Sequence, residues 1–207
     1  MIAIVDYGVG NLFSLRSSLA AIGAEAVVTG DAAVLHEADR IILPGVGAFG
    51  DAADKLAATG MRDAVLREAH AGKPLLGICL GMQLLFEKGM EYGEHAGLGL
   101  IPGTVVDLKP VLPAGLKVPH IGWNALQLRQ PDHPLLKNTR EGDCVYFVHS
   151  FYAVDCADWT LATAEYGVDV TAAVARGNVM GCQFHPEKSG AVGLNILRAF
   201  CETEGKT

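Results

Sequence analysis

The chain has little of what several classes of protein depend on. Its five cysteines are widely spaced and include no Cys-x-x-Cys pair, which argues against a disulfide framework and a zinc site. Lysine and arginine together number 16, against 23 aspartate and glutamate residues. The net charge of −7, without a basic cluster, argues against a nucleic-acid-binding surface.

Long hydrophobic runs are also lacking. No apolar stretch reaches the length of a membrane-spanning helix. Residues 1–6 have neither the basic start nor the small-residue cleavage site of a signal peptide. We therefore expect a cytoplasmic protein that binds neither a membrane nor a nucleic acid.

Small and aliphatic residues are abundant, and half of the sequence is hydrophobic. A chain of 207 residues is long enough to bury a sizeable core without disulfides or metals. No linker, repeat or low-complexity segment divides it. Residues 1–207 are therefore expected to form a single domain.

Strand and helix patterns alternate along the first half of the chain. Strands are predicted at 2–6, 25–28, 40–43 and 74–78, and helices at 12–22, from 31, within 51–71 with a break near Gly60, and at 80–86. This alternation predicts an α/β fold of the flavodoxin-like kind, with an open, mostly parallel sheet and helices on both faces.

The second half is richer in β-branched and aromatic residues, with few helical patterns between them. Strand segments are predicted within 105–108, 118–128, 144–154, 161–166 and 171–184, and a final helix at 190–202. This half is expected to extend the sheet with antiparallel strands.

Cys79 lies between Gly77 and Gly81 where the strand at 74–78 gives way to a helix. The pattern is the cysteine analogue of the Gly-x-Ser-x-Gly nucleophile elbow, in which glycines tolerate a crowded, strained turn. A helix N-terminus also favours the nucleophilic thiolate. A lone cysteine at a strand end is more often an ordinary buried residue. Both glycines and the strand-to-helix context favour a nucleophile.

His185, Pro186 and Glu187 follow a late strand directly. A nucleophilic cysteine needs a base near neutral pH, and the base needs an acceptor that orients it. Side chains two residues apart in an extended segment point the same way, so Glu187 can serve His185. Alone, the motif is more often a surface turn, but together with Cys79 it predicts a Cys-His-Glu triad.

The loop Pro44-Gly45-Val46-Gly47 follows a parallel strand at the sheet edge where such folds bind ligands. Its glycines allow close approach of a ligand to backbone N–H groups, so with the Leu80 N–H it is a candidate oxyanion hole. A phosphate loop or a plain structural turn are the alternatives. The absence of a Walker lysine disfavours the phosphate loop.

These motifs resemble the class I (triad) glutamine amidotransferases over essentially the whole chain. Pro-Gly-Val-Gly at 44–47, Gly-Ile-Cys-Leu-Gly-Met-Gln at 77–83 and His-Pro-Glu at 185–187 occur in the order of that family. Asp-Tyr-Gly-Val-Gly-Asn at 6–11, Trp-Asn at 123–124 and Lys-Ser at 188–189 are similar to one branch of it, the glutaminase subunits of imidazole glycerol phosphate synthases in histidine biosynthesis.

The resemblance implies a mechanism for three of these residues. Cys79 would attack the side-chain amide of glutamine to give a glutamyl thioester, and His185, oriented by Glu187, would protonate the departing ammonia. The oxyanion would be held by the Leu80 N–H and by the peptide of Gly45 and Val46.

The resemblance also implies how glutamine is held. Gln83, Gly47, Ser150 and Phe151 would bind the amino-acid end of the substrate, and a tyrosine is the residue expected at the position of Phe151. It implies neither a cofactor nor a metal. An exposed helical glutamine is the plain alternative for Gln83.

A partner is implied as well, because ammonia that escapes to water becomes protonated and is lost as a nucleophile. The partner would be a TIM-barrel cyclase subunit that forms a heterodimer with this chain and makes imidazole glycerol phosphate and AICAR. Asn11, Trp123, Asn124 and Lys188 would lie at the interface. For Trp123, ordinary core packing is an equally good expectation.

Other interpretations stay open. Another class I amidotransferase, a pyridoxal-phosphate-synthase type of glutaminase or a cysteine peptidase would share an elbow cysteine and a distant histidine, and a non-catalytic scaffold would need neither. The remaining cysteines are expected to be small apolar or surface residues. The following histidines are expected at the surface or in loops: His36, His70, His95, His120 and His133.

Overall fold

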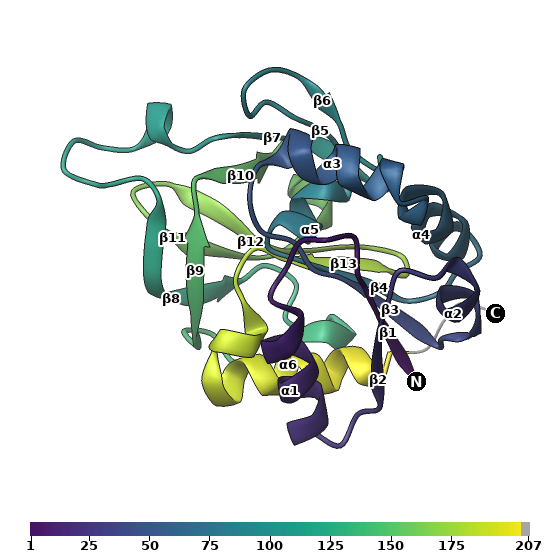
Figure 1. Cartoon of the computed structure of the whole chain (residues 1–207). Coiled ribbons are helices and arrows are strands. Elements are labelled where there is room, and N and C mark those ends of the chain that lie inside the picture. The colour runs from purple at the N-terminus through teal and green to yellow at the C-terminus, as the bar shows by residue number, and fades with distance from the viewer. Residues whose placement is uncertain (204–207) are drawn as a thin grey trace.

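The computed structural model describes residues 1–203 (Figure 1). Its helices are α1 (Leu12–Ala21), α2 (Ala32–Glu37), α3 (Phe49–Ala58), α4 (Met61–His70), α5 (Leu80–Leu84) and α6 (Gly190–Cys201). Its strands are β1 (Ile2–Val5), β2 (Ala26–Thr29), β3 (Arg40–Leu43), β4 (Leu75–Ile78), β5 (Phe86–Gly89), β6 (His95–Ala96), β7 (Ile101–Asp107), β8 (His120–Leu128), β9 (Cys144–His149), β10 (Phe151–Val154), β11 (Thr160–Glu165), β12 (Asp169–Arg176) and β13 (Val179–Cys182).

Nine strands of the described chain form one sheet in the order β2-β1-β3-β4-β13-β12-β11-β8-β9. The first five run parallel, in the spatial order of a flavodoxin-like sheet. The other four continue it as antiparallel strands. The predicted α/β sheet with an antiparallel extension is confirmed.

Helices cover both faces of this sheet. Helices α1 and α6 lie on one face, and α2 to α5 lie on the other (Figure 1). Period-two alternation along each strand supplies both cores: Ile2 and Ile4 of β1 pack toward α1 and α6, whereas Ala3 and Val5 pack toward the opposite helices.

The sequence did not predict a second sheet, in which strands of the described chain pair in the order β10-β7-β5-β6. The predicted strand segment at 144–154 is divided at Ser150, because His149 pairs with His120 in the large sheet and Phe151 pairs with Asp107 in the small one. Ser150 therefore lies where the two sheets meet.

The segment predicted within 171–184 is a hairpin, with β12 and β13 paired antiparallel from Arg176 and Val179 onward. Gly177 supplies the positive φ of its two-residue turn, at 62°. The helix expected at 80–86 ends at Leu84, and β5 begins at Phe86. Among the described residues, no helix combines the length and the apolar character needed to cross a membrane.

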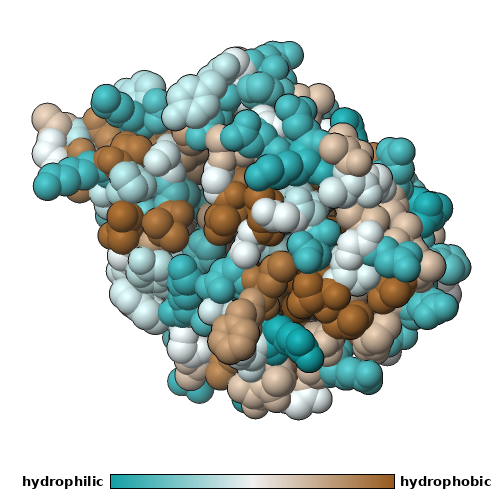
Figure 2. Space-filling model, viewed as in Figure 1, coloured by the Kyte–Doolittle hydropathy of each residue, from teal (hydrophilic) through white to brown (hydrophobic). Residues whose placement is uncertain are grey.

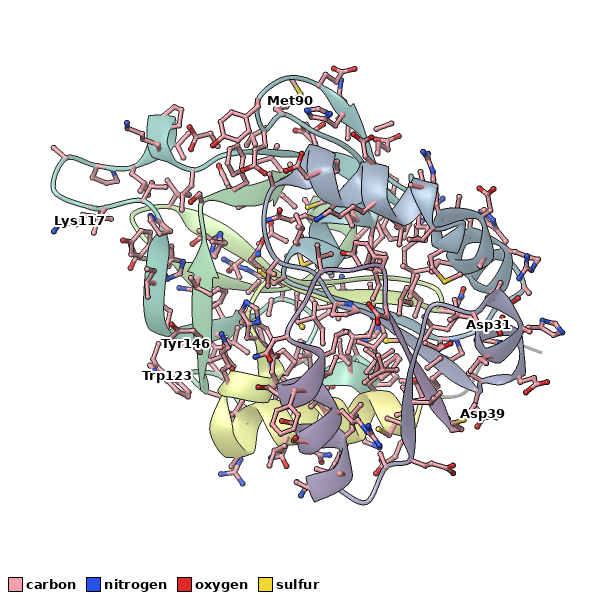
Figure 3. All side chains as sticks on the ribbon, viewed as in Figure 1. Asp31, Asp39, Met90, Lys117, Trp123 and Tyr146 are labelled. Carbon is pink, nitrogen blue, oxygen red and sulfur yellow. The ribbon has the colours of Figure 1, made fainter. Side chains whose placement is uncertain are left out.

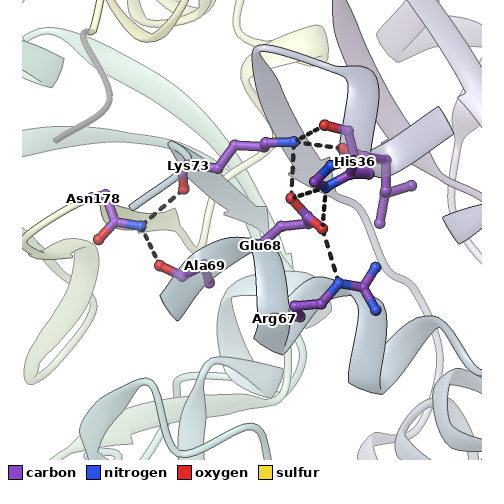
Figure 4. A network of polar contacts seen from close by, with 7 residues as sticks. His36, Arg67, Glu68, Ala69, Lys73 and Asn178 are labelled. Atoms are coloured by element: carbon purple, nitrogen blue, oxygen red, sulfur yellow. Dashed lines mark hydrogen bonds and ion pairs between the residues drawn. The ribbon is translucent and has the colours of Figure 1, made fainter. Parts of the chain in front are cut away.

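A buried carboxylate ties α2, α4 and the turn after β12 together (Figure 4). The Glu68 side chain is 3% exposed and lies 3.0 Å from Lys73 Nζ, 3.1 Å from Arg67 Nε and 3.2 Å from His36 Nδ1. Asn178 Nδ2 donates to the main-chain carbonyl of Lys73. Burial raises the pKa of Glu68, but the hydrogen bonds from Lys73, His36 and Arg67 outweigh it and hold that pKa below its ordinary 4.5.

We expect Glu68→Gln to lower the free energy of unfolding by about 2–3 kcal/mol at neutral pH, because the cations then face a neutral amide. The native pKa of Glu68 is depressed, so its stabilisation is present above pH 4.5 and is lost as the pH falls below that value. The difference between wild type and variant should therefore shrink on acidification. Urea unfolding at neutral pH and at about pH 4 measures it, with the exposed Glu25→Gln as the matched control. An equal loss at both pH values would contradict the prediction.

Candidate active site

Cys79 lies between β4 and α5 with φ 54° and ψ −111°, a conformation that side chains with a Cβ rarely adopt. Glycines make this turn sterically feasible. A Cβ at Gly81 would lie 1.8 Å from the Leu43 carbonyl oxygen, and one at Gly77 would lie 2.6 Å from the Gly81 oxygen. The strand, the strained turn and the helix lie where the Gly-x-Cys-x-Gly motif predicts them.

His185 approaches Cys79 because β4 and β13 are neighbouring parallel strands, and the Cys79 N–H donates to the Cys182 oxygen at 2.8 Å. His185 Nδ1 lies 2.8 Å from Glu187 Oε1, and both side chains are buried. Burial lowers the pKa of His185, but contacts with Cys79 and Glu187 outweigh it and raise that pKa to about 9. His185 therefore holds a proton at neutral pH.

The main chain around His185 is held by a residue that the sequence analysis did not single out. The Ser189 hydroxyl donates to the His185 carbonyl oxygen at 2.6 Å and accepts from the Tyr146 N–H at 3.0 Å. The His185 N–H donates to the Tyr146 oxygen at 2.9 Å. Ser189 thus joins the histidine loop to β9.

Replacing Glu187 by glutamine keeps an acceptor for His185 but removes the charge, so we expect the pKa of His185 to fall below its present value of about 9. Glutamine hydrolysis should slow roughly 10- to 100-fold, the usual effect of losing a hydrogen bond to a charged group. The alkaline limb of its pH profile should move to lower pH. NMR titration of the histidine ring and a pH–rate profile measure both effects. An unmoved profile would contradict the orienting role.

Cys79 opens into a cavity of about 350 Å³. Its walls are Val46, Gly47, Cys79, Leu80, Gln83, Glu91, Pro119, Val148, His149, Ser150, Phe151, His185 and Lys188. A far smaller cavity shares Val46 and His185 and is lined by Asn11, Gly45 and Glu187. The fold thus brings together the residues predicted for the triad, the oxyanion hole and the substrate.

The predicted oxyanion loop lies directly against the start of α5. A Cβ on Gly45 would lie 2.8 Å from Tyr7 Oη and 3.0 Å from Leu80 Cβ, so no larger residue fits. Buried Tyr7, missed from the sequence, donates to the Pro44 carbonyl oxygen at 2.8 Å, and burial raises its pKa. Leu80 is the first residue of the helix, where N–H groups lack an intrahelical acceptor. The loop and that N–H therefore lie side by side at the start of α5, next to Cys79.

A sequence model of the family described as glutamine amidotransferase class-I matches residues 3–203. This chain belongs to the class I glutamine amidotransferases. A curated protein from Wolinella succinogenes named imidazole glycerol phosphate synthase subunit HisH is 50% identical over 204 residues, which cover 98% of this chain and 99% of that protein. A protein of the same name from Bacillus licheniformis is 52% identical and covers 97% of this chain and 95% of its own.

Solved structures of amidotransferases share the fold. One described as a crystal structure of glutamine amidotransferase superposes with a TM-score of 0.75 at 20% identity, over 98% of each chain. The structure of PurLQS from Thermotoga maritima gives a TM-score of 0.73 at 22% identity, over 97% of this chain and 96% of that one.

Gln83 forms part of the wall of the amidotransferase pocket. Its Nε2 donates to the Phe151 carbonyl oxygen at 2.9 Å and to Gln183 Oε1 at 3.0 Å. Both N–H groups are therefore committed to the protein, which leaves the Gln83 carbonyl oxygen as the atom that a ligand can engage. Gln83 is 4% exposed, so the alternative of an exposed helical glutamine is wrong.

Two histidines beside the pocket are fully or nearly fully buried. His149 Nδ1 lies 2.9 Å from the Phe151 carbonyl oxygen, and His149 Nε2 lies 3.0 Å from His120 Nδ1. His120 was expected in a loop or at the surface, but it has no exposed area and stacks between the rings of Phe147 and Tyr166. The aromatic partners are distant in sequence, so spacing alone gave no signal for this correction.

Asn124 extends this chain of contacts. His120 Nε2 lies 2.7 Å from Asn124 Oδ1, and Asn124 Nδ2 donates to the Glu165 carbonyl oxygen at 3.0 Å. Burial lowers the pKa of both histidines, to about 3 for His149, where nearby His120 contributes. Both rings are therefore neutral. Among the described residues, no group of three His, Cys, Asp or Glu side chains is arranged to hold a metal ion.

The residues predicted at the interface do not share one surface: Trp123 points outward from β8, whereas Asn124 points toward His120. Trp123 is 55% exposed, so the alternative of core packing is wrong. Trp123 lies next to Tyr146 (Figure 3), with the two ring centroids 5.9 Å apart in an edge-to-face arrangement. Lys188 Nζ lies 5.8 Å from the centroid of the same tyrosine ring. Asn11 caps α1 by accepting from the Ser14 N–H.

Strand alternation explains why Asn124 differs from its neighbour. Ile121 and Trp123 point outward from β8 and are 57% and 55% exposed, whereas Asn124 points toward His120. Figure 2 shows hydrophobic side chains gathered in several patches among hydrophilic ones on the face that Figure 1 presents. Phe13 and Val46 are further large hydrophobic residues with exposed side chains.

Proposed function

We propose that this chain is the glutaminase subunit of an imidazole glycerol phosphate synthase and acts as a single domain in the cytoplasm. It hydrolyses glutamine to glutamate and ammonia and passes the ammonia to a cyclase subunit. The observation that carries the proposal is the strained Cys79 beside the buried His185–Glu187 pair in a cavity of about 350 Å³. Identity near one half to proteins named HisH, over nearly whole chains, supports this branch of the family.

In the first half of the reaction, the Cys79 sulfur attacks the side-chain amide carbon of glutamine. The amide oxygen becomes an oxyanion held by the Leu80 N–H and the Gly45–Val46 peptide. Collapse of this adduct breaks the carbon–nitrogen bond. His185 gives its proton to the leaving nitrogen, so ammonia and a glutamyl thioester on Cys79 result.

In the second half, water attacks the thioester carbonyl and His185 accepts its proton. The carbon–sulfur bond then breaks, which releases glutamate and returns the proton and the sulfur to the starting pair. The Glu187 carboxyl accepts from His185 Nδ1 and stabilises the imidazolium, which is present before the attack and forms again when water gives up its proton.

The cavity offers complementary groups for the amino-acid end of glutamine. Glu91, which the sequence analysis missed, lines the cavity and accepts from the Phe49 N–H at the start of α3. Its carboxylate and the Gln83 carbonyl oxygen suit the substrate ammonium group. Lys188 and the backbone around Gly47 and Ser150 suit the substrate carboxylate.

The partner is proposed to be a TIM-barrel cyclase subunit that turns the ammonia into imidazole glycerol phosphate and AICAR. It would dock over the surface that carries Asn11, Trp123 and Lys188, while Asn124 lies on the other side of β8 and contacts His120. Gly45 and Gly47 flank Val46, whose side chain is 44% exposed, so a peptide rearrangement on docking is sterically feasible there. Completion of the oxyanion hole on docking would limit wasteful hydrolysis.

We expect Trp123→Ala to weaken binding of the cyclase subunit at least tenfold, because buried aromatic anchors contribute strongly to interfaces. The side chain is 55% exposed in the free chain, so the unfolding midpoint should change little. Titration calorimetry with the purified cyclase subunit measures the affinity, and His70→Ala, exposed at the end of α4, serves as the control. Unchanged affinity would mean that the cyclase subunit does not bind at the Trp123 side of β8.

The decisive experiment measures ammonia release from glutamine with and without the cyclase subunit and its nucleotide substrate. We expect stimulated hydrolysis and transfer of ammonia to the cyclase product. A peptide-hydrolysis assay tests the cysteine peptidase alternative, and alkylation of Cys79 by a glutamine-analogue electrophile tests the scaffold. Failure to hydrolyse glutamine under every one of these conditions would overturn the proposal.

A further inference from the structure

Gln183 lies between β13 and His185 and has no exposed area. Its N–H donates to the Ala172 oxygen at 2.9 Å, which keeps this segment extended beside β12. Alternation along the extended segment turns Phe184 into the core beneath the sheet and Gln183 toward the cysteine. The Gln183 Nε2 atom lies 3.7 Å from Cys79 Sγ.

Hydrogen bonds farther from Cys79 determine which end of the Gln183 side-chain amide faces the sulfur. The Phe151 carbonyl oxygen is an obligatory acceptor, so the amide of Gln83 must turn its Nε2 toward it. The same Nε2 donates to Gln183 Oε1, so the Gln183 amide must turn its own NH₂ toward the sulfur of Cys79. A flipped Gln183 would place two NH₂ groups face to face, with each lacking an acceptor.

We propose that Gln183 is a further catalytic residue, whose side-chain amide donates a hydrogen bond to the Cys79 sulfur, stabilises the thiolate and holds it for attack. The inference rests on the proposed function for the reaction that the thiolate performs. The contact itself comes from the geometry alone.

The donor acts on one state of the sulfur more than on the others. In the thiol, the S–H points to the Val148 carbonyl oxygen, 3.9 Å from the sulfur. Once the proton has moved to His185, the sulfur is an anion and the Gln183 N–H becomes a charge-assisted donor. In the thioester, the sulfur is a weak acceptor again. Gln183 therefore favours the attacking form and adds little to glutamine binding.

A merely structural role makes a different prediction. If Gln183 only filled space behind Gln83, its loss would disturb the substrate wall and raise KM. If Gln183 activates the sulfur, its loss slows every reaction of that sulfur, including reactions that involve no glutamine. Alkylation by iodoacetamide separates the two roles.

The test compares Gln183→Met, which removes the donor at similar size, with Glu91→Gln, which disturbs the cavity wall but leaves Gln83 and the Gln183 donor in place. Both are made in a background in which the more accessible Cys144 and Cys201 are serines. Gln127→Met, a half-buried glutamine on β8, is the matched control. Folding is checked by circular dichroism, and the modified cysteine is identified by peptide mass spectrometry.

We expect Gln183→Met to slow Cys79 alkylation roughly 10- to 100-fold and to lower kcat by a similar factor, with KM within about threefold of wild type. Glu91→Gln should raise KM and alkylate at nearly the wild-type rate. A folded Gln183→Met with wild-type alkylation overturns the inference, as does equal slowing in Glu91→Gln.

If Gln183→Met does not fold, Gln183→Leu decides the question by the same readouts. It removes the donor without placing a charge beside the sulfur, so slow alkylation supports the inference and a wild-type rate overturns it. A wild-type chain that releases no ammonia from glutamine with its cyclase subunit present refutes the proposed function, while the alkylation rates still decide the role of Gln183.

Discussion

Replacing Cys79 by glycine is expected to abolish glutamine hydrolysis and yet give a protein about 1–2 kcal/mol more stable than the Cys79→Ala variant. In ordinary helices and strands the order is reversed, because glycine loses more backbone entropy on folding than alanine does. At position 79 the backbone has φ 54° and ψ −111°, which opposes any Cβ. The two variants differ by that one carbon, so the difference in their stability is the strain less the extra backbone entropy that glycine loses.

Activity should fall by at least about ten-thousand-fold in both variants, since neither has a nucleophile. Urea unfolding gives the stability difference, and ammonia release in the presence of the cyclase subunit gives the activity. Ala57→Gly, on the exposed side of α3, should instead lower the free energy of unfolding by about 0.5–1 kcal/mol. It is the control that shows the ordinary, destabilising effect of glycine. A Cys79→Ala variant more stable than the glycine variant by the same margin of about 0.5–1 kcal/mol would mean that the elbow stores no strain.

The second large effect is expected at Gly81. Gly81→Ala should cost about 3 kcal/mol or more, because its Cβ would lie 1.8 Å from the Leu43 carbonyl oxygen, a backbone atom that cannot rotate away. Either β3 or α5 must move to relieve this overlap. Since α5 begins one residue before Gly81 and one after Cys79, the nucleophile and the Leu80 N–H would move with it.

Glutamine hydrolysis should therefore fall by at least about 100-fold in Gly81→Ala even below its unfolding temperature. Thermal unfolding and ammonia release measure the two effects. Gly30→Ala is the graded control, because its Cβ would lie 3.0 Å from another carbonyl oxygen, that of Asp6, and should cost far less. Near-wild-type activity in Gly81→Ala would show that the elbow adapts to the extra carbon.

The sequence predicted the parallel half of the fold well, because each strand there is a short apolar run followed by a turn rich in glycine or proline. It predicted the elbow for the same reason: the strained position of Cys79 requires glycines at 77 and 81, and glycines are visible in a sequence. His185 and Glu187 could be paired because they lie two residues apart, but the predicted extended segment was wrong: Glu187 lies in a short 3-10 helix at Pro186–Lys188, and that tight turn brings its carboxyl to His185.

What the sequence did not predict depends on contacts between distant segments. Ser150 changes sheets because its neighbours pair with β8 on one side and β7 on the other, and no local pattern marks that choice. Tyr7 and Glu91 acquire their roles from the carbonyl or N–H that they meet in the fold. His120 carries no hydrophobic signature, since its burial follows from two distant aromatic rings, that of Phe147 on β9 and that of Tyr166 in the turn after β11.

The contacts of His120 and His149 need more hydrogens than two neutral imidazole rings carry. The chain of contacts from the Phe151 carbonyl oxygen to Asn124 Oδ1 has three links, and each link needs one hydrogen because both ends are acceptors. Two neutral imidazole rings bring two hydrogens. With both rings neutral, one of the three links beside the proposed glutamine pocket lacks a hydrogen, and two lone pairs face each other there.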